Sequence, residues 1–112
     1  MAGGAQLSVP DMRRAGRHPV ELKTIVEHRE RGDILLHVVN ISVQGFMIDN
    51  AETLNRGDRV LLRLPVVGRI EAYCMWTKDN RAGFQFERLL RSDDYSRLVE
   101  QTQPNPNLRR AR

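Results

Sequence analysis

The stretch Asn40-Ile41-Ser42-Val43-Gln44-Gly45 sets small polar residues into the middle of a long apolar run. Apolar residues precede it over residues 34–39 and resume over residues 46–48, which predicts that one strand ends and the next begins here. Asn and Ser can hydrogen-bond nearby backbone in a turn, and glycine can adopt a positive φ or allow another group to approach the backbone closely. Two interpretations follow: a structural connection between strands, or a pocket floor that presents amide, hydroxyl and bare backbone to a planar polar ligand.

Short segments of alternating polarity surround this stretch. In the first of them, Val20, Leu22 and Val26 share one face while charged side chains take the other, as a half-buried strand requires; Ile25 breaks the pattern. Polar turn signals separate the segments. The predicted strands cover residues 20–27, 34–40, 46–49, 59–64, 69–77 and 82–87. Six short strands with regularly spaced turns indicate an all-β protein, either an antiparallel barrel or a sandwich.

One helix is predicted after the last strand. Ser92 is a suitable N-cap, and the two aspartates that follow it suit the positive end of the helix dipole. Tyr95, Leu98 and Val99 then form an apolar stripe at helical spacing. The helix should end at about Gln103, because the next residue is a proline.

A cluster of arginines lies just before the first predicted strand. The segment Arg13-Arg14-Ala15-Gly16-Arg17, followed by the stretch 40–45, resembles the two-part signature R-x-x-x-R and [D/N]-x-S-x-x-G of PilZ domains, the bacterial receptors for cyclic di-GMP. Residues 72–76 and 83–86 also resemble the last two strands of that family, so the resemblance covers roughly residues 12–87. It implies a PilZ-like six-stranded antiparallel β-barrel with one C-terminal α-helix.

The resemblance also implies a binding site for cyclic di-GMP, a ligand with two phosphates and two guanines. A guanidinium group pairs bidentately with phosphate or with the O6 and N7 edge of guanine and can stack on a base, whereas lysine matches neither geometry. Many family members carry Asp at the place of Asn40, so the amide gives up a charge-assisted contact but both donates and accepts hydrogen bonds. The site residues implied by the resemblance are Arg13, Arg14, Arg17, Asn40, Ser42 and Gly45.

A signalling role follows from the same resemblance. Binding would order the N-terminal arginine segment against the barrel and create a surface for an effector protein, because no output domain fits in 112 residues. The expected organisation is a flexible lead over residues 1–11, a PilZ-like domain over residues 12–103 and a disordered basic tail over residues 104–112.

Composition and charge leave two alternatives open. The formal net charge is +4, but six of the 18 basic residues lie in residues 1–17 and 104–112 with only one of the 14 acidic residues, so the rest of the chain is nearly neutral. That distribution argues against a polynucleotide surface. The alternatives are a small basic β-barrel that binds RNA or DNA through its arginine ends, and a protein-interaction module without a ligand. With no apolar run of membrane-spanning length and no signal-peptide pattern, a cytoplasmic protein is expected.

No residue pattern predicts an enzyme or a metal site. The spacings of His18, His28 and His37 fit no metal-binding motif, and His37 is interpreted as a satisfied core or strand-face histidine. The lone Cys74 is predicted to be buried and inert. The aromatic residues Trp76 and Phe84 are predicted to lie in the core, and the resemblance leaves strand residues near Gly83 as the alternative, as neighbours of the pocket. We therefore expect no catalytic residue, no metal and no cofactor besides the ligand.

Overall fold

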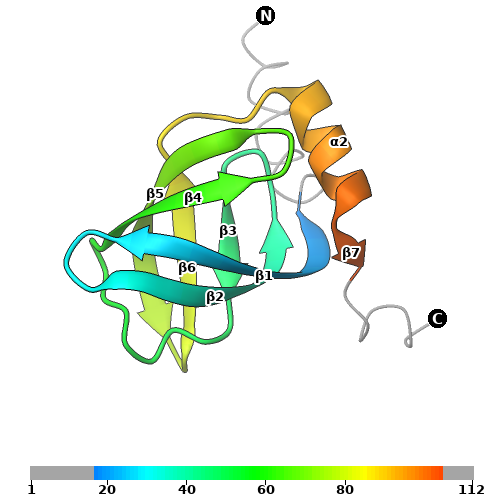
Figure 1. Ribbon diagram of the computed structural model, residues 1–112. Coiled ribbons are helices and arrows are strands. Elements are labelled where there is room, and N and C mark those ends of the chain that lie inside the picture. Colours follow the sequence, from blue (N-terminus) through cyan, green and yellow to red (C-terminus); the bar gives the residue numbers. More distant parts are fainter. Residues whose placement is uncertain (1–16, 105–112) are drawn as a thin grey trace, which may run out of the picture.

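Six antiparallel strands close into a barrel in the computed structural model, which describes residues 17–104 (Figure 1). Their order around the barrel is β2-β3-β6-β5-β4-β1, and pairing of β1 with β2 closes the ring. The strands are β1 His18–His28, β2 Gly32–Ile41, β3 Gly45–Ile48, β4 Arg59–Leu64, β5 Gly68–Lys78 and β6 Arg81–Phe86. The all-β barrel is thus confirmed. Arg13, Arg14, the predicted lead 1–11 and residues 105–112 of the predicted tail lie outside the described residues.

The helix α2, Ser92–Gln101, lies against one end of the barrel (Figure 1). Its N-cap is Arg91, with extended backbone (φ −69°, ψ 146°) and no side-chain capping bond, so the prediction of Ser92 as N-cap is wrong. The reason is that the carbonyl of Arg91 already accepts the first helical hydrogen bond, from the N–H of Tyr95 at 2.8 Å. The two aspartates lie in the first turn, as predicted.

The chain after α2 adds a strand that the sequence did not predict. The helix ends at Gln101 rather than at Gln103, because Thr102 is extended (ψ 155°). The two-residue strand β7, Gln103–Pro104, then pairs with β1 outside the six-stranded ring. Its partners, Val20 and Glu21, lie where the register between β1 and β2 shifts.

The core consists of alternating strand side chains, of Ala51, Leu54 and Leu90 from connecting segments, and of residues of the helix. Leu98 of α2 is fully buried against this core. Burying one such side chain stabilises the fold by about 1.5–3 kcal/mol. Cys74 is buried as predicted, and burial raises the pKa of its thiol. The largest fully buried side chains of the barrel are Val20, Val26, Leu36, Val38, Ile41, Ile48, Val60, Leu62, Ile70 and Cys74.

A bulge in β5 changes which way its last side chains point. Cys74 pairs with Phe84, but Trp76 pairs with Gly83, so Met75 is an extra residue on β5. Phe84 is buried, which confirms that prediction. The indole of Trp76 is 41% exposed, so its predicted place in the core is wrong. Alternation predicted a core position, but the bulge turns this residue onto the outer surface.

Candidate ligand-binding site

A hollow of about 410 Å³ on the outer surface of the barrel brings residues from both halves of the predicted site together. Arg17 comes from the segment before β1, and Asn40, Ser42 and Gly45 come from the connection between β2 and β3. A volume of this size is within the usual range for small-molecule sites. The remaining lining residues are Gln44, Phe46, Met47, Met75, Trp76, Gly83, Phe84, Gln85 and Leu89.

Asn40 reaches the hollow because the ladder between β2 and β3 is irregular just before it. Val38 pairs with Ile48 and Asn40 pairs with Met47, so one residue of β2 is left over between them. Val38 points into the core, and regular alternation would send Asn40 there as well. The bulge instead places a half-buried amide in the wall of the hollow, with its Nδ2 4.0 Å from the sulfur of Met47.

Ser42 shapes the turn that follows. Its hydroxyl oxygen accepts hydrogen bonds from the backbone N–H groups of Gln44 (3.1 Å) and Gly45 (3.3 Å), and its own N–H donates to the carbonyl of Gly45 (2.8 Å). Such side-chain-to-backbone bonds are what makes serine favourable in turns. The structural interpretation of the stretch is therefore confirmed for Ser42, and it coexists with a place in the wall of the hollow.

The carbonyl groups of this turn are held by other parts of the barrel. Three of these carbonyl groups accept a hydrogen bond each, one from β6, one from the segment after β6 and one from α2. The Tyr95 hydroxyl is a donor at neutral pH, and burial raises its pKa further above the ordinary value. These hydrogen bonds hold residues 40–45, the floor of the hollow, in place. The contacts run from Phe86 N to Gln44 O (2.8 Å), from Leu90 N to Val43 O (3.0 Å) and from Tyr95 Oη to Ile41 O (3.1 Å).

Gly45 is required by a close approach of two strands. A Cβ atom at this position would lie 1.9 Å from the carbonyl oxygen of Phe84 on β6, and backbone cannot move aside as a flexible side chain can. Gly45 is the register partner of Gln85, so β3 and β6 meet here. Of the two roles considered for this glycine, close approach rather than positive φ applies.

The opposite side of the hollow is an apolar surface that the sequence did not predict. The indole of Trp76 lies on the backbone of Gly83, where a Cβ atom would come 2.1 Å from the indole nitrogen. Met75 and Leu89 are next to it in the wall of the hollow and are 49% and 60% exposed. Exposed apolar side chains gathered at one hollow are typical of a binding surface. The sequence signal that could have indicated this surface was Trp76 near the end of the fifth predicted strand, followed by Gly83 in the sixth.

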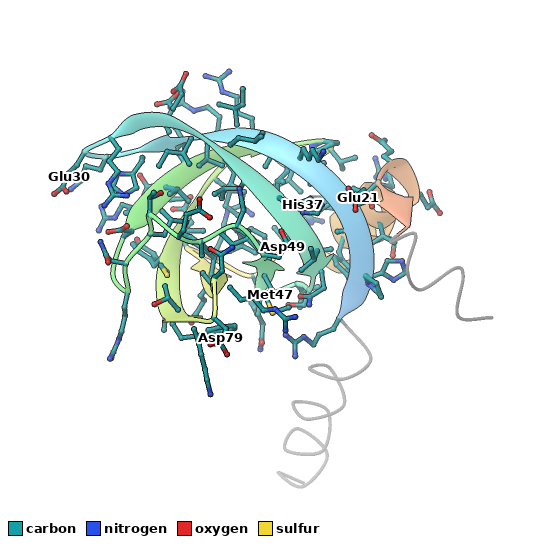
Figure 2. All side chains as sticks on the ribbon, turned by 90° about the horizontal axis from the view of Figure 1, so that it is seen from below. Glu21, Glu30, His37, Met47, Asp49 and Asp79 are labelled. Atoms are coloured by element: carbon teal, nitrogen blue, oxygen red, sulfur yellow. The ribbon has the colours of Figure 1, made fainter. Side chains whose placement is uncertain are left out.

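Arg17 completes the wall from the N-terminal side. It directly precedes β1 and is exposed, with its guanidinium group available to a ligand in the hollow. Figure 2 shows the side chains on the ribbon from below and labels Met47 of β3, another residue that lines the hollow. Because His18 pairs with Ile41, Arg17 supplies a positive charge beside the neutral, hydrogen-bonding stretch 40–45.

Other polar clusters in residues 17–104 do not form a metal site, since no group of three or more His, Cys, Asp or Glu has a suitable arrangement. The buried His28 has a structural role: its Nδ1 accepts from the N–H groups of Glu30 (3.0 Å) and Arg31 (3.1 Å). Its Nε2 lies 3.1 Å from Asp58. Burial works to raise the pKa of Asp58, but the hydrogen bond from the N–H of Asn55 and the neighbouring His28 ring outweigh it and lower that pKa.

The family model described as PilZ domain matches residues 2–103, which include all six strands of the barrel and α2. No curated protein sequence matches the chain significantly. Among the helices of residues 17–104, none has the length and apolar character needed to cross a membrane.

Proposed function

Because this chain belongs to the PilZ domain family, we propose that it is a receptor of the bacterial cytoplasm that passes the level of cyclic di-GMP to a partner protein. The family implies a module that binds cyclic di-GMP, and its members are binding domains rather than enzymes. The observation that carries the proposal is the shared hollow. Arg17 and the stretch 40–45 are separated by two strands in sequence, yet both line it.

Arginine is the residue that recognises the anionic and planar parts of the ligand. The exposed Arg17 can form two parallel hydrogen bonds with a phosphate or with the O6 and N7 edge of a guanine. Arg13 and Arg14, outside the described residues, belong to the same arginine segment, and we assign them to the ligand by family resemblance. Three arginines would more than balance the two negative charges of the ligand.

Trp76 offers a stacking surface for a guanine. Its indole rests on Gly83 with part of the ring system open to the hollow, so a base can lie on it without displacing a core side chain. Stacking of a base on an aromatic ring contributes about 1–3 kcal/mol. We therefore add Trp76 to the residues that bind the ligand.

The floor would read the edge of a base. Asn40 has an amide that donates and accepts, and its contact with the sulfur of Met47 is weak enough at 4.0 Å to be exchanged for a ligand contact. The oxygen of Ser42 is used in the turn, but its hydrogen makes only a long contact of 3.5 Å with the carbonyl of Gly45. That hydrogen can be donated to the ligand.

Ligand binding would be signalled to the partner protein through a new surface. Cyclic di-GMP bridges the fixed floor and the arginine segment, and this segment then lies over the hollow as part of a composite face for the partner protein. Ordering a segment on binding costs free energy that is taken from the ligand affinity.

A calorimetric titration tests the proposal. Cyclic di-GMP should bind, while GMP and cyclic AMP should bind at least about a hundredfold more weakly, because each lacks the second base and phosphate that engage the other side of the hollow. Equal affinity for the three nucleotides, or no binding of cyclic di-GMP, would overturn it.

A further inference from the structure

His37 on β2 is held between two carboxylates from two other segments of the chain. Its Nε2 lies 2.9 Å from Oε2 of Glu21 on β1, and its Nδ1 lies 2.7 Å from Oδ1 of Asp49, the residue after β3. Figure 2 shows these three labelled residues grouped on one side of the barrel. The prediction that His37 is a satisfied strand-face histidine is confirmed.

The geometry requires the charged form of the ring. A neutral imidazole has one N–H donor, whereas ionised carboxylates only accept, so two short contacts to carboxylates need both ring nitrogens to carry hydrogen. His37 is therefore an imidazolium ion when both contacts are made. A metal ion would need one of these nitrogens free, which agrees with the lack of a metal cluster among residues 17–104.

The titration of His37 has a definite sign. Burial works to lower its pKa, but the hydrogen bonds and charges of Asp49 and Glu21 outweigh this effect and raise the pKa above its ordinary value of 6.5. The contacts of His37 with the two carboxylates therefore stabilise the folded protein fully below about pH 6.5. This stabilisation is lost as the pH rises through the higher pKa that His37 has in the folded protein. Lys23, the register partner of His37, is the further charged residue that faces it from β1.

The three members of this cluster lie on or beside three of the segments that line the hollow. Glu21 is four residues after Arg17, His37 is three residues before Asn40, and Asp49 is two residues after Met47. Near the cluster, the register between β1 and β2 shifts between Pro19 and Leu22, and Val20 and Glu21 pair with β7 instead.

The corner at Asp49 is held by further bonds to the same strands. Asn50 accepts from the N–H of His37 (3.0 Å) and donates to the carbonyl of Leu35 (2.9 Å). The side-chain amide of Asn80 donates to the carbonyl of Asp49 (3.3 Å). Glu21 has no such set of side-chain bonds within residues 17–104, so loss of the His37 proton should release the Glu21 side chain before it releases Asp49.

We propose that His37 is a positioning residue for the cyclic di-GMP site and that its protonation strengthens ligand binding. The proposal rests on the proposed function. The start of β1 is paired with β2 at His18 and Pro19 and with β7 at Val20 and Glu21. Within that frame, the ionic contact with Glu21 adjusts where Arg17 lies relative to the floor. By linkage, the ligand must in turn favour the protonated form of His37.

Calorimetric titrations of the full chain with cyclic di-GMP from about pH 6 to about pH 8.5, the range in which histidine changes charge, test this proposal. The affinity of the wild type should fall by about tenfold across this range. His37→Gln should bind weakly with no pH slope, and Glu21→Gln should lose most of the slope. His18→Gln is the matched control, because His18 adjoins Arg17 but makes no contact with the two carboxylates; it should keep the slope.

A wild-type affinity that does not change with pH, or a His37→Gln variant that keeps the slope, would overturn the proposal alone. Absence of binding at every pH would overturn the proposed function and this inference with it. Should His37→Gln not fold, an NMR titration of the His37 ring in the wild type decides. Saturating cyclic di-GMP should move the titration midpoint of the ring to higher pH, and an unchanged midpoint contradicts the proposal.

Discussion

The two sides of the hollow are built in different ways. The floor, residues 40–45, is half-buried or buried, and its carbonyl groups accept bonds from β6, from Leu90 and from α2. The exposed side of the lining, by contrast, consists of side chains open to solvent, among them Arg17 before β1 and Trp76 on β5, which flank the floor from different strands. Because the floor is part of the barrel, changes there should cost stability, whereas changes on the exposed side should cost ligand affinity alone.

The largest effect on stability is expected for Gly45→Ala. The new Cβ atom would meet the carbonyl oxygen of Phe84 at 1.9 Å, and relieving this contact means separating β3 from β6. We expect a loss of about 3 kcal/mol in the free energy of unfolding, measured by urea denaturation.

Gly32→Ala is the control for this variant. Gly32 has a φ of +78° and open space around its Cα, so alanine there should cost only about 1 kcal/mol. If the two glycine variants lose the same stability, the close approach of β3 and β6 does not define the floor.

A smaller loss is expected for Ser42→Ala. The variant removes the acceptor of the N–H groups of Gln44 and Gly45, and we expect a cost of about 1–2 kcal/mol by chemical denaturation. Ser42→Thr keeps the hydroxyl group and should recover most of it. A fully stable Ser42→Ala protein would place the role of this hydroxyl in the ligand rather than in the turn.

Trp76→Ala should change affinity much more than stability. The indole is partly exposed and lies on Gly83, so its removal should lower the affinity for cyclic di-GMP by at least about fivefold, while the thermal midpoint stays within a few degrees. Trp76→Phe should retain a stacking surface and most of the affinity.

Gly83→Ala gives an independent way to displace the same ring. Its Cβ atom would meet the indole of Trp76 rather than backbone, so the ring should shift and binding should weaken. The contrast with Gly45→Ala is direct, since one methyl group meets a side chain and the other meets a strand. Unchanged affinity of both the Gly83 and Trp76 variants would contradict the stacking role.

The smallest effect on stability is expected for Arg17→Ala. Arg17 is exposed and precedes β1, so the thermal midpoint of the free protein should not change measurably, while the affinity for cyclic di-GMP should fall by at least about tenfold. Arg17→Lys should not restore binding, because an ammonium group lacks the bidentate geometry. Unfolding of the Arg17→Ala protein would instead make this residue structural.

Local patterns predicted the strands well because alternation records burial directly. The prediction of a strand over residues 59–64 coincides with β4, and Ile70, Ala72 and Cys74 point into the core as their spacing indicates. The connection over residues 40–45 was identified by its polarity. The strands and the polar connection are determined by residues close together in the chain, so local patterns are enough to predict them.

Local sequence patterns could not predict the bulges or the long-range contacts. The alternation that ends at Trp76 continues unbroken in the sequence, so nothing local reveals the extra residue Met75 that turns the indole outward. The cluster of Glu21, His37 and Asp49 joins three segments, and only the register of the barrel brings them together. Both features lie at or beside the hollow, where bulges re-aim side chains.

Hydrogen exchange of the backbone amides, measured with and without cyclic di-GMP, tests the contrast between the two sides most directly. We expect the amides of β5 and β6 and of the floor to be protected in both states, because their bonds belong to the barrel. Amides of residues 13–17 should gain protection when the ligand is added. Protection of residues 13–17 that is the same with and without saturating cyclic di-GMP would contradict a fixed floor that is closed by a ligand-ordered arginine segment.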